Sequence, residues 1–75
     1  MAKINRLKTI LTEKNLTSRW LSAQLEVDPT TVSKWCTNSS QPDILTLLRI
    51  ARLLDVEVKD FYDEELYQSY LTYYK

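Results

Sequence analysis

The sequence contains no glycine and no histidine, and it has only one cysteine. Without glycine there is no glycine-rich loop to hold a phosphate, and without histidine there is no imidazole for acid–base catalysis. A zinc site usually needs several cysteine or histidine ligands, and an internal disulfide needs two thiols. These absences predict a protein of a reducing compartment that carries no metal or other cofactor and is not an enzyme.

Long apolar runs are also missing, since none approaches the length of a membrane span or of a secretory signal core. We therefore expect a soluble, cytoplasmic protein. The 75 residues, 44% of them hydrophobic, are enough for one domain with a small core and little surplus stability.

The formal net charge is zero, but the charges are segregated along the chain. Residues 1–54 hold eight Lys or Arg against four acidic residues, and residues 55–75 hold two against six. The first part can therefore present a basic face to a polyanion while the acidic end points away. Ordinary scatter in a short chain is the alternative, so the charge pattern supports nucleic-acid binding only weakly.

Residues 17–37 predict two short helices joined by a tight turn. Thr17 is able to cap a helix N-terminus. Asp28 is a second cap, and it is followed by Pro29 at the first helical position, where the missing N–H costs nothing. Two residues separate the two patterns. Helices so closely joined have the geometry of a helix-turn-helix, whose second helix can lie in the major groove of DNA.

Three further helical patterns complete an all-α fold of five helices. Apolar residues recur at three- and four-residue steps over about residues 3–14, which predicts the first helix. After the polar loop at residues 38–42, Asp43 caps a fourth helix, and a fifth begins near Glu57. The fourth helix is expected to bury Ile44, Leu47, Leu48, Ala51 and Leu54.

Several short motifs keep one register over about residues 5–62 without a gap. They are Leu21-Ser22, Leu25-Glu26-Val27, Val32-Ser33-Lys34, Pro42 and the run Leu47-Leu48-Ile50-Ala51-Leu54-Asp55-Val56. Together they resemble the phage repressor and Cro family, also called XRE-type helix-turn-helix. The resemblance implies a compact five-helix DNA-binding domain that usually acts as a dimer on an operator with two half-sites.

The resemblance also implies a DNA site, carried over position by position. Ser18 falls where the family approaches a phosphate, and Arg19 beside it carries a cation that can attract one, although a solvated surface explains Arg19 equally well. The positions where the family touches base edges hold Pro29, Thr30, Ser33 and Lys34, with Thr31 among them. The positions where the family grips the DNA backbone hold Thr37, Asn38, Ser39 and Ser40.

The chain departs from the family pattern at the ends of three helices. The family usually places glycine there because the backbone adopts a left-handed conformation. This sequence has Glu26, Asn38 and Asp55 instead. Asparagine and aspartate tolerate that conformation, whereas glutamate should lower the stability of the fold by about 1 kcal/mol relative to glycine. A frequent acidic residue near the end of the third helix is replaced by Cys36, so a contact normally made there is in doubt.

The third helix has a polar face even when the family is set aside. Short hydroxyl side chains and one lysine lie opposite the apolar Val32 and Trp35. Short side chains allow close approach to the floor of a groove, and Lys34 is long enough to reach guanine acceptors. A solvated helix surface of the same composition is the alternative reading.

Residues 63–75 form a C-terminal extension to the predicted domain of residues 1–62. The last fourteen residues contain all five tyrosines, and the pattern suits a helix and a strand equally. We predict a homodimer formed through Leu66, Tyr67, Tyr70, Leu71, Tyr73 and Tyr74. The alternative is that this extension folds back on its own core.

The sequence therefore predicts a sequence-specific regulator of transcription, similar to a repressor, whose partner is double-stranded DNA. Neither a membrane nor a small-molecule ligand is expected. A protein-interaction module, such as the antitoxin partner of a toxin, is the alternative, with the tyrosine-rich extension as its contact surface. The neutral overall charge favours the alternative slightly, and the polar face of the third helix favours DNA.

Overall fold

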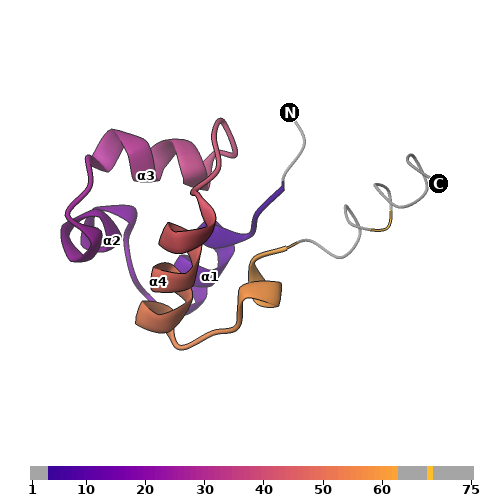
Figure 1. Ribbon diagram of the computed structural model, residues 1–75. Helices are drawn as coiled ribbons and strands as arrows, with labels where there is room; N and C mark the ends of the chain where they lie inside the picture. Colours follow the sequence, from indigo (N-terminus) through magenta and orange to yellow (C-terminus); the bar gives the residue numbers. More distant parts are fainter. Residues whose placement is uncertain (1–3, 63–67, 69–75) are drawn as a thin grey trace.

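The computed structural model describes residues 4–62 and residue 68 as an all-helical arrangement (Figure 1). The elements are α1 (Leu7–Glu13), α2 (Ser18–Leu25), α3 (Pro29–Cys36), α4 (Ile44–Leu54) and the 3-10 helix η1 (Val58–Phe61). The only extended pairing among the described residues is an isolated antiparallel bridge between Asn5 and Tyr62. The predicted all-α class is confirmed for this part of the chain.

One core joins all five elements. The largest fully buried side chains come from one element each, namely Leu7, Leu21, Val32, Ile50 and Phe61. Partly buried apolar residues, Trp20 among them, pack around this centre. Because no element has a core of its own, the orientation of α3 depends on its packing against the others.

Three helices begin at the caps that the sequence predicted. The Trp20 amide donates to Thr17 Oγ1 over 3.0 Å, and the Thr30 amide donates to Asp28 Oδ1 over 2.7 Å. The Thr46 amide donates to Asp43 Oδ1 over 2.8 Å. This backbone hydrogen bond holds the pKa of the Asp43 carboxyl below its ordinary value.

Left-handed backbone occurs without glycine at four described positions. The φ angles are 56° at Glu26, 62° at Asn38 and 55° at Asp55, as predicted, and 58° at Asn15. Three of the four are asparagine or aspartate, which adopt this conformation most readily after glycine. Glu26 is the exception, and it forms the turn between α2 and α3.

The first helix is shorter than predicted. It begins at Leu7 rather than near Lys3, and Ile4 before it is exposed. The Asn5 side chain explains the late start, because its Oδ1 accepts from the Leu7 amide while its backbone bridges to Tyr62. A short polar side chain that bonds nearby amides opposes helix and favours a helix start.

The fifth helix is likewise shorter than predicted, because it is the single 3-10 turn η1. The Glu57 amide donates to Asp60 Oδ2 over 2.9 Å, and the two residues form a capping box around the turn. The Phe61 carbonyl then accepts from the Arg6 amide over 2.7 Å, which ties the turn to the start of α1.

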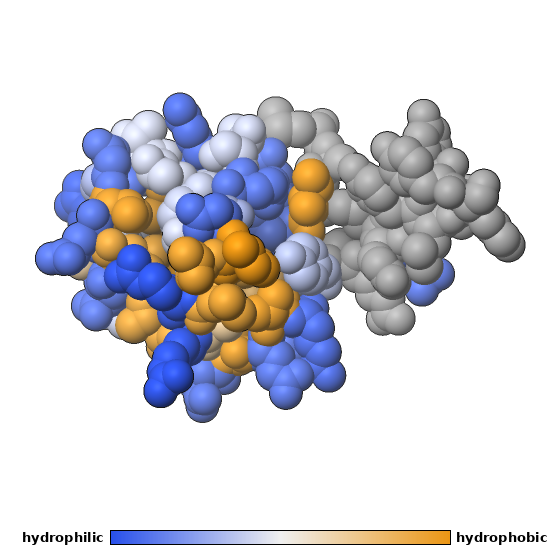
Figure 2. All heavy atoms as spheres, in the orientation of Figure 1, coloured by the Kyte–Doolittle hydropathy of each residue, from blue (hydrophilic) through white to orange (hydrophobic). Residues whose placement is uncertain are grey.

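The apolar stripe of α4 was only partly predicted. Leu47, Ala51 and Leu54 are buried as expected, and Ile50 joins them. Ile44 and Leu48 were wrongly assigned to the core, since they are 64% and 49% exposed. Three- and four-residue spacing fits two adjoining faces of an apolar helix, so the pattern could not tell which face meets the core. An apolar patch therefore lies over α4 in the middle of the molecule (Figure 2).

A buried amide network fastens the N-terminal segment to the end of α3. Asn38 Oδ1 accepts from the amides of Ile4 and Asn5, both at 2.8 Å, and Asn38 Nδ2 donates to the Asn5 carbonyl over 3.2 Å. In return, Asn5 Nδ2 donates to the Trp35 carbonyl over 3.0 Å and to Gln41 Oε1 over 2.7 Å. Buried polar groups must be paired in this way, so the network fixes where the loop after α3 runs.

We expect Glu26→Gly to leave the protein equally stable or more stable by up to about 1 kcal/mol, because glycine removes the side-chain penalty of the left-handed turn. Ala23→Gly is the matched control, since Ala23 is exposed inside α2. That change should cost about 1 kcal/mol. Thermal unfolding measures both, and a clear fall in Tm for Glu26→Gly would contradict the turn described here.

We expect Asn38→Gly to cost at least about 2 kcal/mol, because glycine keeps the left-handed backbone but leaves the amides of Ile4 and Asn5 without their acceptor. Asn15→Gly is the matched control, since Asn15 is also left-handed but is exposed. Its stability should change little. Urea unfolding of the two variants compares them, and equal effects would contradict a stabilising role for the buried amides.

Candidate nucleic-acid interface

Helix α3 runs along an outer edge of the molecule (Figure 1). It buries Val32 and Trp35 and turns its other side to solvent. The predicted base-reading residues lie on that side. Pro29, Thr30, Ser33 and Lys34 are exposed and Thr31 is half-buried. Hydroxyl side chains therefore dominate a narrow, exposed helix face, as the sequence predicted.

The end of α3 is held by hydrogen bonds that leave its hydroxyls at the surface. The Lys34 carbonyl accepts from the Ser39 amide over 2.9 Å, from the Ser40 amide over 3.3 Å and from Thr37 Oγ1 over 3.3 Å. Thr37 Oγ1 and Ser39 Oγ also lie 3.0 Å apart. The predicted backbone-gripping residues Thr37, Ser39 and Ser40 are thus exposed together beside the last turn of α3.

Asn38 was predicted to be one of these contact residues, but the structure turns its side chain inward. It is 9% exposed, and both polar ends of its carboxamide are bonded to the N-terminal segment. The family position alone could not show this, because the partner residues lie more than thirty positions earlier in the chain. Asn38 therefore shapes the loop rather than offering a side chain to a ligand.

The two predicted residues of α2 lie at its beginning. Ser18 is half-buried and follows the Thr17 cap, while Arg19 is exposed. The Arg19 carbonyl accepts a hydrogen bond from Ser22 Oγ over 2.7 Å. This bond involves the backbone of Arg19 and not its guanidinium. Neither of the described ion pairs involves Arg19, so its charge faces solvent.

Asp28, which the sequence predicts only as a helix cap, also lies on this surface. Asp28 is exposed directly before α3. Its Oδ1 is engaged by the Thr30 amide, and its backbone carbonyl accepts from Thr31 and Val32. An anionic side chain at this helix end disfavours a phosphate and can instead accept a hydrogen bond from the amino group of a cytosine.

Cys36 and Trp35 have structural surroundings. Trp35 is 6% exposed, and its carbonyl is part of the amide network. The Cys36 thiol is half-buried, and burial raises its pKa above the ordinary value, although the nearby Lys8 cation opposes this shift. A thiol held in the protonated form is a poor nucleophile.

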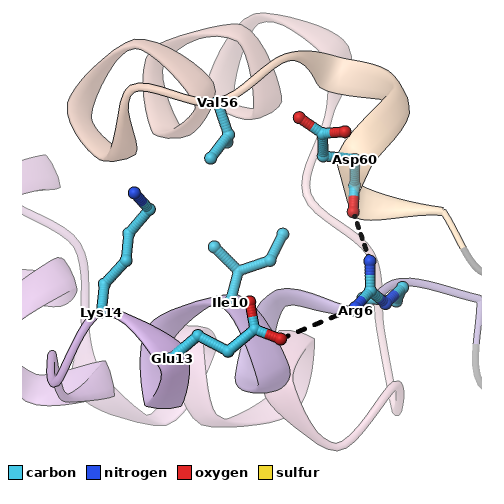
Figure 3. A pocket seen from close by; sticks show the side chains of 6 residues that line it. All are labelled: Arg6, Ile10, Glu13, Lys14, Val56 and Asp60. Carbon is cyan, nitrogen blue, oxygen red and sulfur yellow. Dashed lines mark hydrogen bonds and ion pairs between the residues drawn. The ribbon is translucent and has the colours of Figure 1, made fainter.

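A pocket of about 440 Å³ lies between α1 and the segment around η1 (Figure 3), and none of its lining residues comes from α3. It is lined by Arg6, Ile10, Glu13, Lys14, Val56 and Asp60. The Arg6 guanidinium is engaged by Glu13 at 3.9 Å and by the Asp60 carbonyl at 3.4 Å. Because charges of both signs line the pocket, it lacks the single-sign field that would select a charged ligand.

The described part of the chain holds neither a metal-binding cluster nor a helix that could span a membrane. No group of three or more His, Cys, Asp or Glu residues there is arranged to hold a metal ion. No helix within residues 4–62 has both the length and the apolar character needed to span a membrane.

Comparisons with known proteins agree with this geometry. A helix-turn-helix family model matches residues 7–61. The crystal structure of a proposed DNA-binding protein from Bacteroides fragilis is similar, with 40% sequence identity and a TM-score of 0.78, over 80% of this chain and 97% of that one. No curated protein sequence matches. The family match covers most of the chain and includes α2, α3 and the turn at Glu26 between them. The chain therefore belongs to the helix-turn-helix family of the phage repressor (XRE) type.

Proposed function

We propose that this protein is a sequence-specific DNA-binding regulator of transcription, of repressor type, that inserts α3 into the major groove of DNA. The observation that carries the proposal is the exposed hydroxyl and lysine face of α3 on a helix-turn-helix frame. The groove admits one α-helix, and short side chains let that helix approach the base edges. The Bacteroides fragilis relative supports DNA as the partner.

The proposed DNA contacts divide into two groups. The base edges are contacted by Pro29, Thr30, Thr31, Ser33 and Lys34. The phosphates are contacted from the two ends of the motif by Ser18, Arg19, Thr37, Ser39 and Ser40. Lys34 is long enough and positively charged, so it can donate hydrogen bonds to the acceptor atoms of guanine. The Ser and Thr hydroxyls can donate hydrogen bonds to, or accept them from, several bases. No catalytic step or cofactor enters this function, and we place it in the cytoplasm.

We propose that the functional unit is a homodimer. Two copies would present two α3 helices to half-sites about 34 Å apart, one turn of the duplex. The residues proposed for the dimer contact, Leu66, Tyr67, Tyr70, Leu71, Tyr73 and Tyr74, lie outside the described residues.

The second candidate is a protein-interaction module such as an antitoxin, and the exposed apolar residues of α4 favour it. Titration of the full chain against random duplex at two salt concentrations separates the candidates. A DNA-binding protein loses affinity as salt rises, with a log–log slope of about −0.9 for each phosphate it neutralises. Absence of binding at low salt would exclude the proposal that the protein is a DNA-binding regulator. Selection from random duplexes would then identify the operator of a chain that does bind.

We expect Lys34→Ala to weaken operator binding by about 1–3 kcal/mol if the lysine contacts a guanine, or to reduce the salt slope by about one if it contacts a phosphate. Lys59→Ala is the matched control, because Lys59 lies on η1 and pairs with Glu57 at 3.3 Å. Fluorescence anisotropy measures both variants. Unchanged affinity and slope for Lys34→Ala would exclude both roles.

We expect Asp28→Asn to strengthen binding to random duplex, by several-fold at low salt, because it removes a negative charge from the DNA-facing end of α3. Asparagine caps a helix as well as aspartate does, so the fold should be kept. Asp55→Asn removes a charge at the far end of α4 and is the control. Equal gains from the two changes would show that Asp28 does not face the DNA.

A further inference from the structure

The outward α4 face, made of Ile44, Leu45, Leu48, Arg49 and Arg52, has no partner among the described residues. Its three apolar side chains are 64%, 72% and 49% exposed in chain order. They stand within about one turn of one another along α4. Figure 2 shows apolar side chains gathered over this helix. Grouped apolar side chains of this size on a small domain mark a contact surface.

The charge beside these apolar residues is positive. Arg49 and Arg52 are exposed on the same helix and take part in neither of the described ion pairs. The outward α4 face therefore suits an occupant with acidic residues next to apolar or aromatic ones. Residues 63–75 have this order, because Asp63, Glu64 and Glu65 stand directly before Leu66 and Tyr67.

The continuous described segment, residues 4–62, also ends near the beginning of α4. Tyr62 is bridged to Asn5, and Asn5 Nδ2 bonds Gln41 Oε1, three residues before Ile44. The thirteen residues that follow Tyr62 span at most about 43–47 Å when extended. Helix α4 is only about 16 Å long. The C-terminal residues are therefore long enough to cover the full length of an α4 face.

We propose that residues 63–75 of a second copy dock on the outward α4 face, with Asp63, Glu64 and Glu65 against Arg49 and Arg52. The exchange is reciprocal, so both faces are covered at once. It rests on the dimer proposed above and names the surface that forms it. A stable interface buries about 1,200–2,000 Å² in total. One helix face is too small for that, and thirteen further residues from each chain supply the remainder.

A charge-swap experiment on the full chain tests the exchange. Variant A carries Arg49→Glu and Arg52→Glu, and variant B carries Asp63→Lys, Glu64→Lys and Glu65→Lys. Each variant alone opposes like charges at both contacts, so its dimer dissociation constant should rise at least about tenfold above that of the unmodified chain. In a mixture of A and B both contacts join opposite charges, so a heterodimer should form. Sedimentation velocity measures each sample, and circular dichroism verifies that each variant is folded.

A second pair of variants tests the apolar part. Leu48→Ser should weaken the dimer at least about tenfold. Ile4→Ser should leave it unchanged, because Ile4 is also exposed, 36% against 49%, but lies before α1 and not on α4. If the two variants changed the dimer dissociation constant equally, the outward α4 face would not be the contact.

Three other outcomes would overturn the inference. They are a monomeric unmodified chain, dimers of A and B as tight as those of the unmodified chain, and a mixture that stays monomeric. A monomeric chain would leave the outward α4 face to its own C-terminal residues or to another protein. Binding of the same monomer to random duplex would show that the DNA-binding proposal survives, since α3 carries it without the dimer.

Discussion

The Asn38 carboxamide oxygen accepts hydrogen bonds from the amides of Ile4 and Asn5, and this contact fixes where the loop after α3 runs. It joins the N-terminal segment to the loop that leaves α3. Through Asn5 the same network reaches the first amide of α1 and the bridge to Tyr62. In a chain without glycine, one asparagine supplies both the left-handed turn and the bonds that anchor it.

Helix α3 has one buried side and one exposed side, and the amide network holds its C-terminal end in place. Val32 and Trp35 are committed to the core, and the Trp35 carbonyl is held by Asn5. The hydroxyl side chains are then left on the solvent side, where they carry the proposed contacts with DNA. A rigid position matters for such contacts, because base readout depends on hydrogen bonds of defined geometry.

Local chemistry explains which features the sequence could predict. Three helices are capped by side chains that bond amides two or three positions away, namely those of Thr17, Asp28 and Asp43. Because these bonds are local, the caps can be predicted from the sequence. The left-handed turns follow from the family pattern and from residue type. The exposed face of α3 was predictable because its polar and apolar residues alternate with the helical period.

Contacts between distant segments explain what the sequence could not predict. Asn38 was assigned to DNA, since nothing nearby shows that its partners are Ile4 and Asn5. The late start of α1 combines a local bond, from the Leu7 amide to Asn5 Oδ1, with a distant contact, the bridge between Asn5 and Tyr62. On α4, apolar residues cover more of the helix than one core can bury, so Ile44 and Leu48 were misassigned and the outward α4 face was missed.

Amide NMR during titration with operator duplex shows whether the solvent side of α3 is the DNA-binding surface. We expect the largest shifts on residues 28–40 and on Ser18 and Arg19, with small shifts on α1 and η1. Shifts concentrated outside α2, α3 and the loop after α3, with the amides of residues 29–36 unchanged, would contradict this expectation.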